Sequence, residues 1–175
     1  MEQKHSLKIA LAGNPNSGKT SIFNSFTGAR QKVANFPGVT VEKRVGHRKY
    51  GKYDITFVDL PGTYSLTAYS LDEKVARDFI VNEQPDVIIN VIDGGNLERS
   101  LYLTMQLIEI GVDLVIDINM WDEVLESGIK IDTEKLSTLL GAPVLKTIGN
   151  RGQGLDALLD MAIKLAENEI GRAYV

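Results

Sequence analysis

The sequence predicts an α/β domain of three layers, in which helices cover both faces of a mixed, mostly parallel sheet of six strands. Short apolar runs rich in β-branched residues alternate with segments of helical periodicity along nearly the whole chain. Four of these runs are apolar almost throughout, as in strands that are buried on both faces of a parallel sheet. The length of 175 residues, 43% of them hydrophobic, is typical of one soluble domain.

Six strands are expected where apolar runs lie between turn signals, at residues 7–12, 41–50, 53–59, 87–93, 112–119 and 143–148. The second and third runs are joined through Gly51, which predicts an antiparallel pair. Apolar spacings of about 3.6 residues predict five helices, at residues 20–28, 70–81, 97–111, 133–141 and 153–171. The domain is expected to span residues 1–172, and residues 173–175 are expected to form a tail at a truncation point.

The composition excludes several classes of function. The chain contains no cysteine, which excludes a disulfide framework and any thiolate-bound zinc or iron–sulfur site. A formal net charge of −4 argues against a protein that chiefly binds the nucleic-acid backbone. No apolar stretch approaches about 18 residues and the first residues contain no apolar h-region, so neither a membrane span nor a signal peptide is expected. These features predict a cytosolic domain.

A phosphate-binding loop is predicted at GNPNSGKT, residues 13–20, which is a complete match to G-x-x-x-x-G-K-[ST]. It follows an expected strand and opens an expected helix, which is the context that the motif requires. The glycines let backbone N–H groups turn toward phosphate oxygens, Lys19 adds a cation at the β- and γ-phosphates, and the Thr20 hydroxyl ligates Mg²⁺. The alternative is a glycine-rich turn that binds no ligand.

Two further segments are expected beside this P-loop. The strand at 53–59 ends in DLPG, where Asp59 can hold a Mg²⁺-bound water and the Gly62 N–H can sense a γ-phosphate. Thr40 lies between the first helix and the second strand, where a nucleotide switch places a threonine that reaches Mg²⁺ only when the γ-phosphate is present. The interpretation of Thr40 rests on its order along the chain, because an isolated threonine carries little signal.

Guanine recognition is predicted by NMWD, residues 119–122, at the end of another expected strand. This segment resembles the guanine-reading NKxD of GTPases. The Asp122 carboxylate can accept hydrogen bonds from the ring N–H and the exocyclic amine of guanine, which adenine cannot offer. Met120 stands in place of the usual lysine, and its flexible thioether can lie over the base. The alternative is that Asp122 only caps the following helix.

Together, GNPNSGKT, NFPGVTVE, DLPGTYSL and NMWDEV resemble the N-terminal GTPase domain of the ferrous iron transport protein B (FeoB) family, over about residues 7–154. The resemblance implies a Ras-like P-loop GTPase fold, slow Mg²⁺-dependent hydrolysis of GTP and a fused membrane region that serves Fe²⁺ uptake. It implies guanine nucleotides, a helical spacer and transmembrane region absent from this chain, and a small accessory protein as partners. The domain is then expected at the cytoplasmic face of the membrane, with no nucleic acid bound.

The resemblance also implies a set of site residues. Contacts with GTP or GDP are expected from Gly13, Asn14, Pro15, Asn16, Ser17, Gly18, Lys19, Thr20, Ser21, Gly38, Val39, Thr40, Asp59, Leu60, Pro61, Gly62, Asn119, Met120, Asp122, Ile148, Gly149 and Asn150. Catalytic roles are expected for Asn16, Lys19, Thr40 and Gly62. Mg²⁺ is expected at Thr20, Thr40 and, through water, Asp59, and K⁺ is expected at Asn16.

Three positions bear on these expectations. Gly149 stands where the family often has serine, so guanine contacts there depend on the backbone N–H groups of Gly149 and Asn150. Thr63 follows DxxG, where many GTPases place a glutamine that orients the attacking water, so hydrolysis should be slow. Asn16 matches an asparagine that coordinates potassium in related cation-dependent GTPases, and the alternative is that it only stabilises the turn of the P-loop.

The sequence leaves open the role of a basic segment and two alternative functions. Residues 30–52 hold seven Lys and Arg against Glu42 alone, which indicates either a solvated hairpin or a docking surface for acidic lipid head groups or a partner domain. The alternative function is a free-standing soluble GTPase of ribosome assembly or RNA maturation, which would share every nucleotide motif. An ATP-dependent P-loop kinase is a third class, disfavoured by the NxxD segment.

Overall fold

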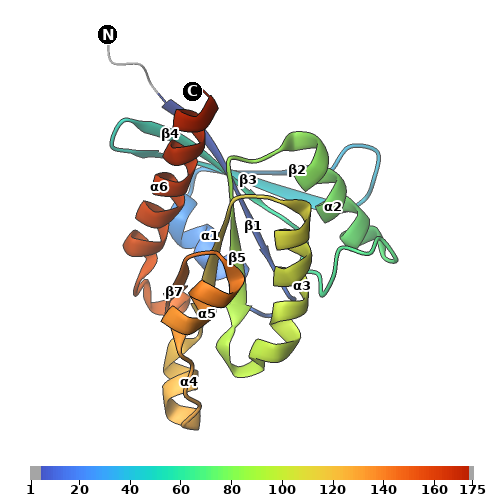
Figure 1. The fold of residues 1–175 in the computed structure, drawn as a ribbon. Helices are drawn as coiled ribbons and strands as arrows, with labels where there is room; N and C mark the ends of the chain where they lie inside the picture. The colour runs from blue at the N-terminus through green and yellow to red at the C-terminus, as the bar shows by residue number, and fades with distance from the viewer. Residues whose placement is uncertain (1–4, 174–175) are drawn as a thin grey trace.

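The protein is a three-layer α/β domain in the computed structural model, which describes residues 5–173 and the side chains of residues 5–168. A seven-stranded sheet in the order β2-β3-β4-β1-β5-β6-β7 forms the middle layer. Helices α1 and α6 pack on one face of the sheet, and α2 and α3 pack on the other (Figure 1). The α/β class and the mixed sheet agree with the expectation from sequence.

The strands pair in two ways. Their bounds are β1 His5–Gly13, β2 Gln31–Asn35, β3 Glu42–Tyr50, β4 Tyr53–Asp59, β5 Val87–Asp93, β6 Leu114–Asn119 and β7 Val144–Lys146. Strands β4, β1, β5, β6 and β7 run parallel, whereas β2, β3 and β4 are paired antiparallel. The expected six-strand count is wrong, because β2 was not predicted. Its sequence QKVAN is mostly polar and exposed, and backbone pairing to β3 at the sheet edge holds it.

The helices follow the predicted segments with one addition. Their bounds are α1 Lys19–Thr27, α2 Leu71–Glu83, α3 Leu97–Ile110, α4 Trp121–Ser127, α5 Thr133–Leu140 and α6 Leu155–Ala173. Two short 3₁₀ turns, η1 Gly94–Asn96 and η2 Gly149–Arg151, complete the set. Helix α4 was not predicted, because it has seven residues and buries one side chain, Val124. Helix α6 extends to Ala173, the first residue of the expected tail, and residues 174–175 lie outside the described residues.

Two apolar clusters hold the layers together. One fills the space between the sheet and helices α1 and α6, and the other lies beneath α2 and α3. Every residue of β6 is buried, as are six of the seven residues of β5, which explains why these strands are nearly continuous apolar runs. The parallel strands all end at one edge of the sheet, and ligands of such folds bind in the crevice at this edge. The predicted motifs follow β1, β4, β6 and β7 there.

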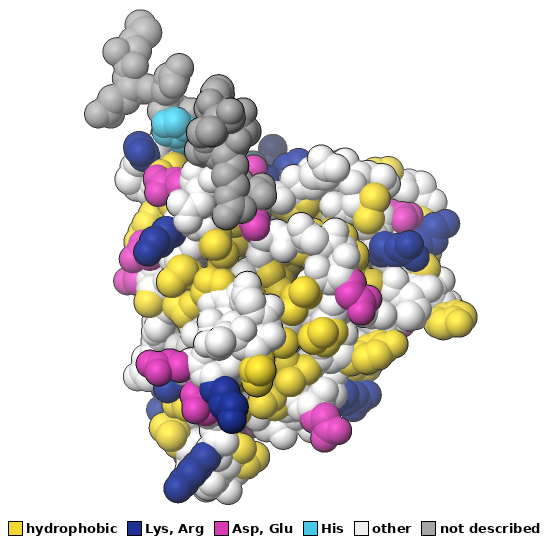
Figure 2. Space-filling view, in the orientation of Figure 1, with side chains coloured by type: hydrophobic (Ala, Val, Ile, Leu, Met, Phe, Trp, Pro, Cys, Tyr) yellow, Lys and Arg dark blue, Asp and Glu magenta, His cyan; other side chains and the backbone are white. Residues whose placement is uncertain are grey.

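Two of the seven basic side chains of residues 30–52 pair with a carboxylate. Lys52 lies 3.8 Å from Glu167 of α6, and Arg44 pairs with Glu42. The Lys43 ammonium lies over the rings of Phe36 and Phe79. On the face that Figure 2 shows, basic and acidic side chains are interspersed around the rim. Among residues 5–173, no helix has the length and apolar character needed to cross a bilayer.

Candidate nucleotide-binding site

The P-loop connects β1 to α1 and is closely packed at both of its glycines. A Cβ on Gly13 would lie 2.6 Å from the Val91 carbonyl oxygen, so no side chain fits there. Gly18 has a φ of 85°, and a Cβ on it would lie 2.2 Å from Asn119 Nδ2. Asn16 also has a positive φ, of 64°. The loop encloses a cavity of about 480 Å³ that is lined by residues 14–20 together with Gly62 and Asp72.

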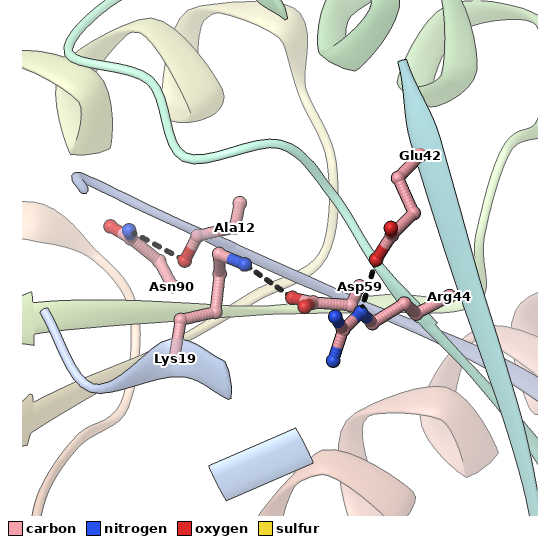
Figure 3. A network of polar contacts seen from close by, with 6 residues as sticks. All are labelled: Ala12, Lys19, Glu42, Arg44, Asp59 and Asn90. Atoms are coloured by element: carbon pink, nitrogen blue, oxygen red, sulfur yellow. Dashed lines mark hydrogen bonds and ion pairs between the residues drawn. The ribbon is translucent and has the colours of Figure 1, made fainter. Parts of the chain in front are cut away.

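Lys19 and Asp59 contact each other beside this cavity. Each side chain is 8% exposed, and the Lys19 ammonium donates to Asp59 Oδ1 (Figure 3). Lys19 is the first residue of α1, whereas Asp59 ends β4, so the pair joins a helix start to a strand end. Thr20 and Ser21 are exposed on the next positions of α1. The structure therefore brings together the cation predicted for phosphate and the carboxylate predicted for Mg²⁺.

The DLPG segment packs directly on the P-loop. The Thr63 N–H donates to the Gly13 carbonyl over 3.1 Å, and the Leu60 N–H donates to the Leu11 carbonyl. A Cβ on Gly62 would lie 3.1 Å from Pro15 Cα, so glycine allows this close approach. Thr63 is 5% exposed. The position where many GTPases carry a water-orienting glutamine thus holds a short, buried side chain.

The Asn119 side chain links two loops that are distant in sequence. Its Nδ2 donates to the Ser17 carbonyl of the P-loop over 2.9 Å, and its Oδ1 accepts the Gly149 N–H, also over 2.9 Å. Asn119 was predicted to read guanine, and the structure gives it a structural role in addition. We call Ser17, Asn119 and Gly149 the amide clamp.

Asp122 and Met120 lie beside this clamp. Met120 has a φ of 57° and is the N-cap residue of α4, so Asp122 lies in the first turn and is not the cap. The Asp122 side chain is 26% exposed, and its Oδ2 lies 3.9 Å from Arg151 Nη2. It is therefore open to a base from solvent. Arg151 was not among the predicted site residues, because no motif points to it.

The packing around Gly149, in the segment after β7, explains why this position holds glycine where the family often has serine. A Cβ on Gly149 would lie 2.8 Å from Ile22 Cγ1 and 3.2 Å from Asn119 Oδ1, so a serine would displace its neighbours. Ile148 pairs with Gln153 across the turn, and Asn150 is exposed. The Gly149 N–H is already bound to Asn119, which leaves the Asn150 N–H as the predicted guanine contact of this loop.

The segment around Thr40 lies away from the phosphate cavity. Gly38, Val39 and Phe36 line a separate cavity of about 430 Å³ against α2. Thr40 is exposed and is not among the residues that line the phosphate cavity. The structure therefore does not bring Thr40 to the other predicted Mg²⁺ ligands.

Asp117 is a buried titratable residue that the motifs did not indicate. It is fully buried in β6, and the Thr147 hydroxyl lies 2.8 Å and 2.9 Å from its two carboxyl oxygens. Burial raises the pKa of the Asp117 carboxyl to about 7, although the hydrogen bond from Thr147 acts to lower it. An aspartate between two isoleucines near the end of the run VDLVIDIN was the available signal.

The fold and the site together define a P-loop nucleotide-binding domain of the GTPase class. Residues 7–162 match the protein family described as ferrous iron transport protein B. The Fe(2+) transporter FeoB of Salmonella typhimurium is 49% identical over 156 residues, which are 87% of this chain and 20% of that protein. The chain thus spans about a fifth of the length of the curated relatives it matches.

Solved structures agree with this match. The cytosolic domain of the T. maritima FeoB iron transporter in a GDP form has a TM-score of 0.89 and 46% identity, covering 93% of this chain and 64% of that one. The FeoB G-domain from Methanococcus jannaschii has a TM-score of 0.83 and 42% identity, covering 93% of this chain and 99% of that one. The chain belongs to the FeoB family and corresponds to its G domain.

The raised pKa of Asp117 predicts a specific dependence of stability on pH. In the unfolded chain this carboxyl titrates near 3.8, and in the folded protein near 7. Its contribution to stability is therefore fully present below about pH 3.8 and is lost as the pH rises to about 7. Relative to Asp117→Asn, wild type should lose up to about 4 kcal/mol of unfolding free energy over this window. Urea denaturation of both proteins at several pH values measures this difference, and parallel profiles would contradict the assignment.

Proposed function

We propose that this chain binds GTP and GDP with Mg²⁺ and hydrolyses GTP slowly. The observation that carries the proposal is the amide clamp, which joins the phosphate loop to the segment predicted to contact the base. Two buried polar atoms beside the phosphate cavity, Asn14 Oδ1 and Ser17 Oγ, have no hydrogen-bond partner among the described residues. Buried polar atoms without a partner suit a polar ligand, as does a P-loop that has no room for a Cβ at Gly18.

Different residues of the chain would bind the phosphates, Mg²⁺ and the base. Backbone N–H groups of the P-loop would bind phosphate oxygens, except at Pro15, which has no N–H, and at Ser17, whose N–H donates to the Asn14 carbonyl. Lys19 would leave Asp59 to pair with the phosphates. Thr20, Thr40 and, through water, Asp59 would hold Mg²⁺, which when bound neutralises phosphate charge. Thr40 must move to take this role, because it lies outside the phosphate cavity in this structure. The Asp122 carboxylate, with Asn119 and Met120 around it, accepts hydrogen bonds from guanine.

The slow rate follows from the DLPG segment. Thr63 offers a buried hydroxyl in place of a glutamine side chain, so no group of that kind orients the attacking water. Asn16 has an exposed side chain beside the cavity, and its amide oxygen would hold K⁺ there, which supplies positive charge near the phosphates. The Gly62 N–H, beside the phosphate cavity, would contact the γ-phosphate.

The proposal extends to the longer proteins of the family. We infer that the domain acts at the cytoplasmic face of a membrane, where its nucleotide state controls Fe²⁺ uptake through a helical spacer, a transmembrane region and a small accessory protein. Support comes from the relatives, which are named as Fe(2+) transporters and are about five times as long as this chain. Residues 1–172 are the proposed GTP-binding unit.

Changes at Asp122 test the choice of base. Asp122→Ala should weaken GDP binding by at least about 10-fold, because each hydrogen bond to a charged group contributes roughly 1.5–3 kcal/mol. Asp122→Asn should shift the preference toward xanthine, which offers an acceptor where guanine offers its amine. Titration of fluorescent GDP and xanthosine diphosphate measures both effects, with Glu123→Ala, an exposed acid of the same turn, as the control. Unchanged affinity in both Asp122 variants would refute guanine recognition.

Asn16 can be tested through the cation dependence of hydrolysis. Single-turnover GTP hydrolysis should be several-fold faster in KCl than in NaCl at matched ionic strength, because the amide oxygen holds K⁺ near the phosphates. Asn16→Ala should lose this difference while its GDP affinity changes little. A wild-type rate that is the same in both salts would leave Asn16 as a residue of the P-loop turn.

A further inference from the structure

A buried carboxyl lies directly behind the amide clamp, and none of the roles proposed above uses it. Asp117 is paired in register with Val91 of β5 and Leu145 of β7, on the sheet face that α1 and α6 cover. Its surroundings on this face are apolar. Among the described residues, the Thr147 hydroxyl is the side-chain hydrogen-bond partner of Asp117.

The contacts of the Thr147 hydroxyl outnumber its hydrogens. Thr147 Oγ1 lies 2.8 Å and 2.9 Å from the Asp117 oxygens and 3.2 Å from Asn119 Oδ1. A hydroxyl has one hydrogen and cannot donate to a carboxylate and to an amide oxygen at the same time. If Asp117 is ionised, it takes the Thr147 hydrogen, and Thr147 Oγ1 then faces Asn119 Oδ1 with lone pairs on both sides.

Rotation of the Asn119 amide does not relieve this conflict. Its Nδ2 donates to the Ser17 carbonyl and its Oδ1 accepts the Gly149 N–H. A flipped amide would place an NH₂ group against the Gly149 N–H and an oxygen against the Ser17 oxygen. The oxygen that faces Thr147 is therefore fixed by the clamp, and a hydrogen between Thr147 and Asn119 must come from Thr147 itself.

We propose that Asp117 is a positioning residue that carries a proton while the nucleotide site is assembled, and that it orients Asn119 through the Thr147 hydroxyl. The Asp117 O–H donates to Thr147 Oγ1, and the Thr147 O–H donates to Asn119 Oδ1. The Asp117–Thr147 pair and the Thr147–Asn119 pair then each share one hydrogen, and only the second Asp117 oxygen lies near Thr147 Oγ1 without one. Loss of the proton withdraws the Thr147 hydrogen from Asn119 and weakens the clamp. The inference rests on the proposed binding of guanine nucleotides.

The surroundings of Asp117 favour the protonated form near neutral pH. Burial raises its pKa to about 7. The charged groups on the elements packed against it are engaged elsewhere or exposed to solvent. These are Lys19, paired with Asp59; Lys146, over the Trp121 ring; Asp93, bound to Gly95 and Asn96; Arg151, near Asp122; Glu167, near Lys52; and the exposed Asp156, Asp160 and Lys164. Removal of the proton is therefore set by burial and by Thr147.

The affinity for GDP as a function of pH tests the proposal. Kd is measured with fluorescent GDP and Mg²⁺ between pH 6 and 8 for wild type and Asp117→Asn, whose amide donates to Thr147 at every pH. The wild-type Kd divided by the Asp117→Asn Kd is a ratio in which the titration of the GDP phosphate cancels. This ratio should rise by roughly 2–10-fold with pH, the equivalent of one hydrogen bond. The Kd of Thr147→Ser, divided by that of Asp117→Asn, should rise with pH in the same way. The same ratio for Thr147→Val, which has no hydroxyl, should not change with pH. A ratio that is flat with pH would overturn the proposal.

A second measurement needs no variant and no nucleotide. Carboxyl ¹³C NMR of the nucleotide-free wild type should show one aspartate that titrates near pH 7, and its absence would overturn the proposal even if Asp117→Asn fails to fold. If wild type binds no guanine nucleotide at any pH, the proposed function fails. The NMR titration then still decides whether Asp117 holds the proton.

Discussion

The amide of Asn119 is the contact on which the geometry of this site depends. It bridges the Ser17 carbonyl and the Gly149 N–H, which belong to segments separated by more than a hundred residues. The bridge also determines neighbouring residue types, because a Cβ on Gly18 or on Gly149 would collide with Asn119 or with Ile22. Asn119 itself is placed by the end of a fully buried parallel strand. The packing of the core therefore determines the spacing between the phosphate loop and the base-binding segment.

In the proposed function, the groups expected to change with nucleotide lie outside this clamp. Thr40 belongs to a loop whose residues Gly38 and Val39 line a cavity against α2, and Asn119 is not among the residues that line it. Lys19 and Asp59 pair with each other beside the cavity, and in the proposed function a phosphate that attracts Lys19 would leave the Asp59 carboxylate available for a water on Mg²⁺. This arrangement would suit the proposed nucleotide switch.

Sequence patterns predicted the features that are encoded locally. Five strands of the parallel part of the sheet were predicted because they are short apolar runs between turn signals, and five helices because their apolar residues recur at spacings of about 3.6. Strand β2 and helix α4 were missed, because β2 is polar on an exposed edge and α4 buries only Val124. The motifs located the P-loop, Asp59 and Asn119, but not the contacts between them. The Lys19–Asp59 pair and the Asp117–Thr147–Asn119 chain depend on strand order, which no local pattern contains. The place of Thr40 depends on the packing of Phe36 and Val39 against α2, and this too is a tertiary effect.

The central claim is that one side chain holds the phosphate and base segments together, and GDP titration of Asn119→Ala tests it most directly. The account predicts affinity weaker by roughly 10–100-fold, the equivalent of two hydrogen bonds, in a protein that remains folded. The matched control is Asn90→Ala, which removes a similarly buried asparagine of β5 that contacts Ala12 and Thr104. This control should lower stability and leave the affinity nearly unchanged. Wild-type affinity in Asn119→Ala, or an equal loss in both variants, would contradict the account.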